Sequence, residues 1–175
     1  MARGMALAIS VVALMIGFAA GTQVAHGQAP GAFGRNVNHV NLMVRDIDKT
    51  VQALADVWGV PVPKISTLNK VPFPPDGTSS GRIKVATVQL DNLRLEVIQP
   101  LDTTPSPWFD FLQKCGEGIH HFGIDASNVP ETVKYLETKG GKWTLGPPNG
   151  SFAYVDLTPR LPFSLEILPP APPKR

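Results

Sequence analysis

Two histidines and two glutamates occupy matching places in the two halves of the chain. His39 in VNHVNLMV aligns with His121 in IHHFGIDA, and the hydrophobic residues that follow align at the same constant offset. Glu96 in RLEVIQP and Glu166 in FSLEILPP match later in each half. Neutral imidazoles and carboxylates together form a mixed nitrogen and oxygen ligand set, which suits one divalent ion such as Fe, Mn, Co, Ni or Zn. Their recurrence in an internal repeat favours a metal centre over four unrelated side chains.

Strand alternation predicts that these four side chains share one face of a sheet. In the predicted strand over residues 37–44, the apolar residues Val40, Leu42 and Val44 share one face. His39 has the opposite phase, so its side chain points away from that face. His121 takes the same phase in its own strand, so the adjacent His120 is expected to point to the opposite side. The residues expected on the inward faces of the four strands include His39, Arg94, Glu96, His121, Asp125, Ser164 and Glu166.

The elements that carry these residues predict two tandem βαβββ modules in one α+β domain. Module one, residues 37–101, contains a strand, a helix and a hairpin that turns at Asp91-Asn92. A linker helix over residues 106–116 leads into module two, residues 118–169. Neither module could cover its own sheet. We therefore expect one curved mixed sheet around a metal-binding trough, with helices on the convex face.

The two chain ends are predicted to lie outside this domain. Residues 1–27 have the layout of a secretory signal peptide, with Arg3, an apolar run over residues 5–20 and small residues before the cleavage site. That run is shorter than the roughly 20 residues of a membrane span. Residues 28–36 are expected to form a flexible lead-in, and residues 170–175 a proline-rich tail. We expect a secreted or periplasmic protein with no membrane attachment after cleavage.

Composition excludes some classes of partner. Hydrophobic residues make up 43% of the 175 residues, which is enough for one compact domain. A net charge of +2 from 17% charged residues does not suit nucleic acid, which requires a basic surface. The single Cys115 excludes an internal disulfide, and is more typical of a small buried residue than of a nucleophile. The expected partner is a small-molecule substrate, and a homodimer is left open.

Four motifs resemble the vicinal oxygen chelate (VOC) superfamily, which includes glyoxalase I, methylmalonyl-CoA epimerase, extradiol dioxygenases and bleomycin-resistance proteins. They are HV-LMV-D, LEVIQPL, GEGIHHFGID and YVDLTP-LPFSLEIL, and the resemblance covers residues 37–169. LEVIQPL with GEGIHHFGID is most similar to the methylmalonyl-CoA epimerase branch. The resemblance implies metal ligands at His39, Glu96, His121 and Glu166. It also implies Glu166 as the catalytic proton-moving carboxylate, with Glu96 as a second candidate.

The sequence departs from the epimerase pattern at one position. Epimerases carry a further glutamate just before the third strand, where this chain has PPDGTSSGRIKV with Asp76 and no glutamate. Asp76 is left open as a substitute for this second base. Coenzyme A thioesters are cytoplasmic, so an exported enzyme is expected to act on another small oxygenated compound that can chelate. Arg94 could bind a substrate carboxylate, and Trp108 could line the pocket, although helix packing is the more typical role for it.

These observations predict an exported, metal-dependent isomerase or lyase of the glyoxalase and epimerase type. A noncatalytic protein that binds a small molecule in the same trough is an alternative. An extradiol-type dioxygenase is another, because its iron site needs two histidines and one carboxylate. Such a site would leave Glu96 without a role.

Overall fold

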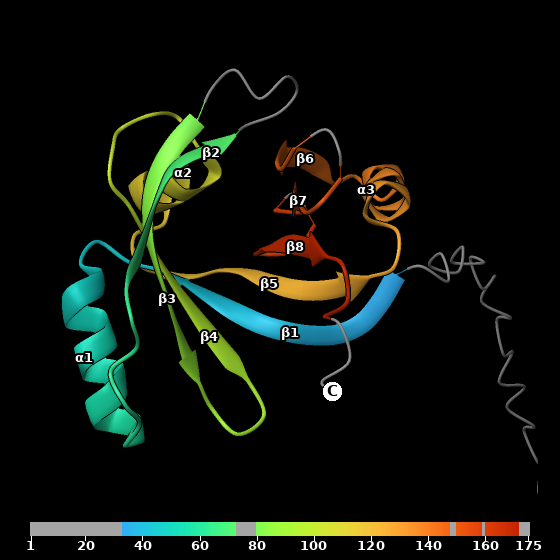
Figure 1. The fold of residues 1–175 in the computed structure, drawn as a ribbon. Coiled ribbons are helices and arrows are strands. Elements are labelled where there is room, and N and C mark those ends of the chain that lie inside the picture. The colour runs from blue at the N-terminus through green and yellow to red at the C-terminus, as the bar shows by residue number, and fades with distance from the viewer. Residues whose placement is uncertain (1–32, 73–79, 148–149, 159, 172–175) are drawn as a thin grey trace, which may run out of the picture.

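The computed structural model describes residues 33–72, 80–147, 150–158 and 160–171 (Figure 1). The predicted signal peptide lies outside these residues, as do Asp76, most of the lead-in and the last four residues of the tail. Within the described part of the chain, no helix is long and apolar enough to cross a bilayer.

The strands form one eight-stranded sheet in the order β2-β3-β4-β1-β5-β8-β7-β6. β1 and β5 run antiparallel at its centre, and each pairs in parallel on its other side, with β4 and β8 respectively. The order on one side of the β1–β5 pair therefore mirrors the order on the other, as two equivalent modules require. The elements are β1 (Phe33–Met43), α1 (Ile47–Trp58), β2 (Ser66–Pro72), β3 (Ser80–Gln89), β4 (Arg94–Pro100), α2 (Pro107–Lys114), β5 (Gly118–Ala126), α3 (Val129–Thr138), β6 (Lys142–Leu145), β7 (Ala153–Asp156) and β8 (Ser164–Leu168).

The sheet curls, and helices α1 and α3 lie outside the curl at its two ends (Figure 1). Helix α1 begins after Asp46, whose side chain accepts a hydrogen bond from the backbone N–H of Lys49 at 3.1 Å. It ends at Gly59, which has the left-handed φ of 65° that glycine adopts without strain. Its buried face packs against Val97 of β4. The predicted α+β fold, with a curved mixed sheet and module helices on the convex face, is confirmed.

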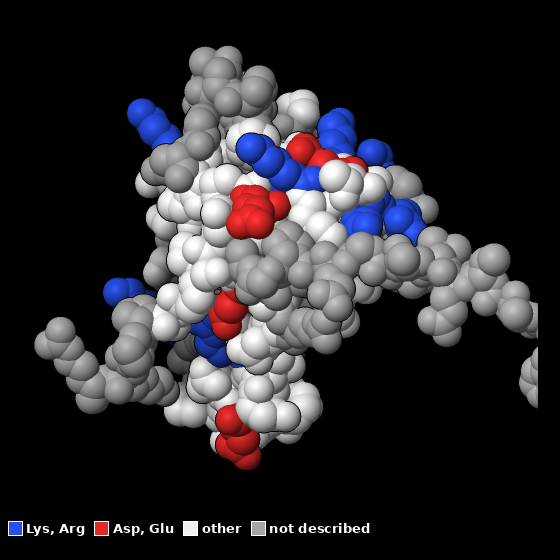
Figure 2. Space-filling model, turned by 90° about the vertical axis from the view of Figure 1, so that its right-hand side faces the viewer, with Lys and Arg blue, Asp and Glu red and all other residues white. Residues whose placement is uncertain are grey.

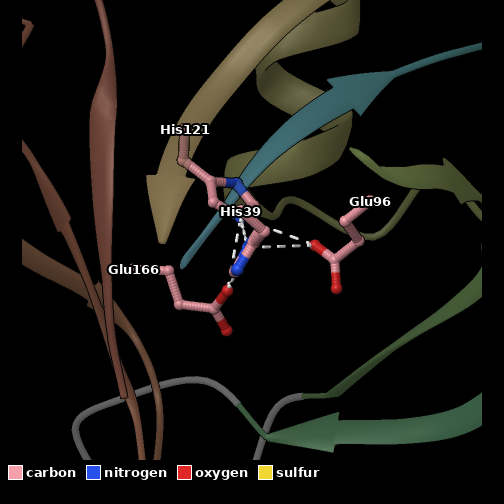
Figure 3. A group of neighbouring side chains, drawn as sticks. All are labelled: His39, Glu96, His121 and Glu166. Carbon is pink, nitrogen blue, oxygen red and sulfur yellow. Dashed lines mark hydrogen bonds and ion pairs between the residues drawn. The ribbon is translucent and has the colours of Figure 1, made fainter. Parts of the chain in front are cut away.

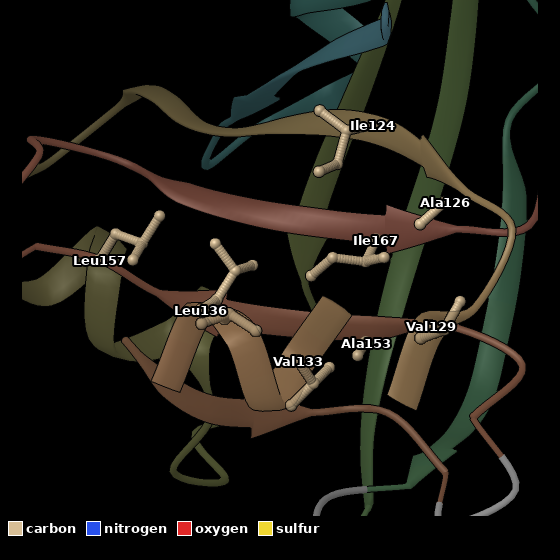
Figure 4. Close-up of a cluster of buried hydrophobic side chains, with 9 residues drawn as sticks. Ile124, Ala126, Val129, Val133, Leu136, Ala153, Leu157 and Ile167 are labelled. Carbon is tan, nitrogen blue, oxygen red and sulfur yellow. The ribbon is translucent and has the colours of Figure 1, made fainter. Parts of the chain in front are cut away.

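Helix α3 covers the second module in the equivalent way. The side chain of Asn128 caps it by accepting from the backbone N–H of Glu131 at 3.1 Å. Its apolar face packs on β5, β7 and β8, and eight residues of this cluster are labelled in Figure 4. The buried members are Ile124, Ala126, Val129, Val133, Leu136, Ala153, Val155, Leu157 and Ile167.

The linker helix α2 packs on the other side of the sheet. Trp108 and Leu112 join a buried cluster with Met43 and Ile98, which belong to the inward-facing phases of β1 and β4. Helix α2 thus closes one end of the concave side with apolar side chains. Strand β2 lies at the edge of the sheet and gains its hydrogen bonds from antiparallel pairing with β3.

Figure 2 shows how charged side chains are distributed on one face of the protein. On the face shown in Figure 2, acidic and basic side chains are interspersed. No continuous band of basic side chains appears among the described residues of that face. A nucleic-acid-binding surface normally concentrates lysine and arginine along one stripe.

Candidate metal centre

The four predicted residues converge from four strands onto one point (Figure 3). His39 lies on β1, Glu96 on β4, His121 on β5 and Glu166 on β8. Each offers one ligand atom, and these four atoms all lie within 4.8 Å of one another. The two histidine Nε2 atoms are 3.2 Å apart. The two module halves thus contribute one histidine and one glutamate each, as the repeat predicts.

The spacing of these atoms fits a divalent ion. Glu166 Oε2 lies 3.0 Å from Nε2 of His39 and 3.3 Å from Nε2 of His121. Glu96 Oε2 lies 3.7 Å and 3.5 Å from the same two atoms. Ligand atoms held about 2.1 Å from one ion stand roughly 3 to 3.4 Å apart when they are neighbours. The imidazole and carboxylate set is also one that Zn, Fe, Mn, Co and Ni accept.

The site is more open toward the first module than toward the second. The side chain of Glu96 is 23% exposed and that of Glu166 is 10% exposed. The cross-strand neighbours differ in the same sense, because exposed Thr87 pairs with Glu96 and buried Tyr154 pairs with Glu166. Glu96 is therefore the more solvent-exposed of the two carboxylates.

Contacts among the four side chains shift the pKa values of His121 and Glu166. Burial alone would lower the pKa of His121, but hydrogen bonds to Glu166 and Glu96 outweigh it and raise that pKa above its ordinary value. Burial alone would raise the pKa of Glu166, but the two histidines outweigh it and bring that pKa down to about 2. Glu166 is therefore ionised at any physiological pH.

Two β-bulges flank the site where β1 meets β5. Val37 pairs with Ile124 and His39 with Gly123, which leaves one extra residue on β1. The second bulge follows on β5, where Asn41 pairs with His121 but Leu42 pairs with Ile119. The extra residues are Asn38 and His120. A bulge changes the direction of the neighbouring side chains, so that two consecutive residues can point to the same face of the sheet.

The prediction that His120 points to the opposite face is wrong for this reason. Its Nδ1 lies 3.0 Å from Nδ1 of His121, and its ring packs against Phe111 of α2 and Tyr154 of β7. Burial lowers the pKa of His120 to about 3, so its imidazole is neutral. His120 thus borders the site on the same side of the sheet as His121.

Arg94 and Asp125 form a polar network beside His39. Asn38 Oδ1 lies 2.5 Å from His39 Nδ1, and Asn38 Nδ2 donates to Asp125 Oδ1 at 2.8 Å. Arg94 donates from Nη2 to Asn38 Oδ1 at 3.3 Å and from Nε to the Asn38 carbonyl at 3.2 Å. Arg94 is exposed, and its role as a substrate contact stays a prediction.

Trp108 lies in the apolar core rather than on an open wall. It is 2% exposed and meets Tyr154 edge to face, with ring centroids 6.2 Å apart. Its predicted contact with substrate stays untested, and its observed contact is helix packing.

Two residues next to the site were not predicted to take part in it. Asn41 is fully buried and donates from Nδ2 to Glu96 Oε2 at 3.2 Å. Tyr154 stands beside Glu166, and burial followed by the Glu166 and Glu96 carboxylates raises the pKa of its hydroxyl well above 10. Asn41 has the inward phase of His39, two residues earlier, so alternation was the signal that could have found it.

The sequence profile of the Glyoxalase/Bleomycin resistance protein/Dioxygenase superfamily matches residues 38–155. The chain belongs to this superfamily, as its motifs, its paired modules and its central site suggest. The matched residues contain His39, Glu96 and His121, and Glu166 follows them.

Among curated proteins, the chain is similar to mitochondrial methylmalonyl-CoA epimerases. It is 35% identical to the mouse protein over 104 residues, which cover 59% of this chain and 52% of that protein. It is 33% identical to the human protein over 104 residues, which cover 59% and 53%. The chain therefore spans about half the length of the curated relatives it matches.

Solved structures show the same fold at low identity. Methylmalonyl-CoA epimerase from Mycobacterium tuberculosis superimposes with a TM-score of 0.54 at 17% identity, covering 83% of this chain and 95% of that one. A Streptomyces coelicolor methylmalonyl-CoA epimerase in complex with 2-nitronate-propionyl-CoA gives 0.52 at 17%, covering 79% and 99%. A 4-hydroxymandelate synthase variant from the same organism gives 0.53 at 19%, covering 80% and 38%.

Proposed function

We propose that this protein is a metal-dependent isomerase of the epimerase and glyoxalase type, acting on a small oxygenated substrate that can chelate an ion. The observation that carries the proposal is the convergence of His39, Glu96, His121 and Glu166 within 4.8 Å. A divalent ion bound there would act as a Lewis acid toward negative charge that develops on substrate oxygens. The similarity to methylmalonyl-CoA epimerases supports proton transfer at a carbon next to a carbonyl group.

Glu166 is the proposed proton-moving group, with Glu96 as the second candidate. Each glutamate turns one oxygen toward the histidine pair and the other away from it (Figure 3). We propose that the second oxygen accepts a proton from a substrate while the first stays with the histidines. Glu166 is ionised, which a base requires, and its pKa must rise in the complex for transfer to be efficient.

The test of the metal centre is the ion content of the purified protein. We expect about one divalent ion per chain, and loss of that ion in the double variant His121→Ala with Glu166→Ala. Glu137→Ala is the matched control, because Glu137 is exposed on α3 and distant from the site. Ion content that persists in the double variant contradicts the proposed ligand set.

The test of the chemistry is exchange of a substrate α-proton for deuterium, followed by NMR. Suitable candidates are α-hydroxy and α-keto acids, α-ketoaldehyde adducts and methylmalonyl-CoA. We expect exchange with one of these classes, and a fall of about 10²–10⁴-fold in Glu166→Gln if Glu166 carries the proton. Tight binding of one compound without exchange would favour the noncatalytic binding protein instead.

We further propose that the mature protein is exported, on the strength of residues 1–27 alone. Mass spectrometry of the mature chain tests this, with a new N-terminus expected near Gly27 or Ala29. An intact N-terminus in a cytoplasmic fraction would contradict it. Export would also make a coenzyme A thioester an improbable natural substrate.

A further inference from the structure

The residue before each site histidine is in contact with that histidine. Asn38 precedes His39 and His120 precedes His121, so the two are repeat-equivalent. Both are the extra residues of the bulges in the β1–β5 pair. Both bring a side-chain atom to Nδ1 of the next residue, at 2.5 Å for Asn38 and 3.0 Å for His120. The two bulges thus produce the same contact with the Nδ1 atom of a site histidine, once in each module.

The neighbours of Asn38 determine the direction of its hydrogen bonds. A carboxylate only accepts, so Asp125 must receive the Nδ2 amide of Asn38. A guanidinium only donates, so Arg94 must bond to the Asn38 oxygen. The Asn38 Oδ1 is therefore the atom that faces His39 Nδ1, and that nitrogen must carry a proton. In the neutral ring this leaves the lone pair on Nε2, the atom that faces the site.

His120 can perform the same task for His121. It is 4% exposed, and Phe111 and Tyr154 hold its ring by edge and stacking contacts at 5.0 and 6.3 Å between centroids. A neutral imidazole has one unprotonated nitrogen, which can accept a hydrogen bond, and His120 turns its Nδ1 toward Nδ1 of His121 at 3.0 Å. If Nε2 of His121 holds an ion, the proton of that neutral ring would lie on Nδ1. His120 Nδ1 is then the acceptor for it.

We propose that Asn38 and His120 are positioning residues, which accept a hydrogen bond from Nδ1 of His39 and His121 and so direct both Nε2 lone pairs to one ion. The proposal rests on the metal centre proposed above. Partners of this kind fix the orientation and tautomer of a ligand histidine, and their removal weakens metal affinity about 10–100-fold. Neither residue belongs to the proposed ligand set.

The experiment measures affinity for Zn²⁺ alone, by competition with a chelating dye. In the second module, His120→Phe keeps a ring but removes the acceptor, while His120→Asn restores an oxygen acceptor like that of Asn38. We expect His120→Phe to bind zinc about 10–100-fold more weakly than wild type. We expect His120→Asn to recover most of that loss. Thermal unfolding of each variant verifies that it folds.

The first module supplies an independent pair of variants. Asn38→Leu removes the acceptor beside His39, whereas Asn36→Leu removes only a second hydrogen bond to Asp125, which Asn36 Nδ2 donates at 3.1 Å. We expect weaker zinc binding in Asn38→Leu and unchanged binding in Asn36→Leu. NMR of the zinc-loaded protein adds a direct readout, because each Nδ1–H signal should lose its protection from exchange only when its own acceptor is removed.

The outcomes separate the two proposals. Wild-type protein that binds no zinc overturns the metal centre and the positioning role together. Wild-type protein that binds zinc, with His120→Phe and Asn38→Leu binding it equally well and keeping protected Nδ1–H signals, overturns the positioning role alone. Equal losses in His120→Phe and His120→Asn also overturn it, since the acceptor would then not be the feature that matters.

Discussion

The backbone of Gly123 lies directly against the imidazole of His39. A Cβ atom at residue 123 would stand 2.1 Å from both Cε1 and Nδ1 of that ring. Gly123 is the cross-strand partner of His39 in the β1–β5 pair, so neither backbone can move away without breaking the centre of the sheet. The His39 ring therefore fits in its place only because residue 123 is a glycine, which has no side chain.

Gly123→Ala should displace the His39 ring and weaken metal binding. We expect zinc affinity to fall by at least about tenfold, because His39 can no longer keep both its Nδ1 partner and its place in the site. The control is Ile124→Val, on the same strand but in the cluster under α3. It should destabilise the protein by about 0.5–1.5 kcal/mol and leave zinc binding intact. Wild-type zinc affinity in Gly123→Ala would contradict the argument.

Metal affinity should rise with pH through the raised pKa of His121. The ion competes with the proton on Nε2, so zinc binding should strengthen as the pH rises toward the His121 pKa, which lies above its ordinary value of 6.5, and level off beyond it. Glu166 adds nothing to this slope, because its pKa of about 2 keeps it ionised throughout. Glu96→Gln removes one carboxylate that raises the His121 pKa, so its curve should shift to lower pH. Titrations at several pH values check both.

The metal-free protein should show the opposite trend in stability. His121 has a higher pKa folded than unfolded, so its contribution is complete below its ordinary value of 6.5 and is lost as the pH rises through the folded pKa. Chemical denaturation with chelator present should therefore give a lower free energy of unfolding at alkaline than at neutral pH. A His121→Gln variant should lose that dependence.

Tyr154 and Thr87 are the cross-strand partners of Glu166 and Glu96. Removal of the hydroxyl group should lower the stability of the protein more at Tyr154 than at Thr87. Tyr154 is buried, and its hydrogen bond with Glu166 is among the causes of its raised pKa. Tyr154→Phe should therefore destabilise the protein by about 1.5–3 kcal/mol, as expected for a hydrogen bond to a charged group. Thr87→Val, at the exposed position opposite Glu96, should change stability by less than about 0.5 kcal/mol. Similar effects in both variants would argue against the asymmetry of the site.

The second-module core should be sensitive to cavity formation. Leu136 is 5% exposed and packs between α3 and the sheet (Figure 4). Leu136→Ala should cost about 2–5 kcal/mol of unfolding free energy, measured by denaturant titration. Glu137→Ala, on the exposed side of the same helix, should stay within about 0.5 kcal/mol. A mild effect of Leu136→Ala would show that the cluster relaxes to fill the space.

Period-two alternation and the internal repeat together selected the four ligand candidates. His39, Glu96, His121 and Glu166 each stand on the polar phase of a strand, and a repeat brings equivalent strands together around one axis. The helix starts at Asp46 and Asn128 are of the same local kind, because each capping side chain bonds to a backbone N–H only three residues further along the chain. Features with a local physical cause can be predicted from local sequence.

Only the tertiary structure decided which side chains support the site. Whether a strand carries a bulge depends on its pairing register with a partner, and alternation within β5 alone sent His120 to the wrong face. The same holds for Gly123, because the side chain that requires a glycine there is His39, which lies on another strand. The sequence by itself determined which residues could form a metal centre, and cross-strand pairing decided how their rings are held.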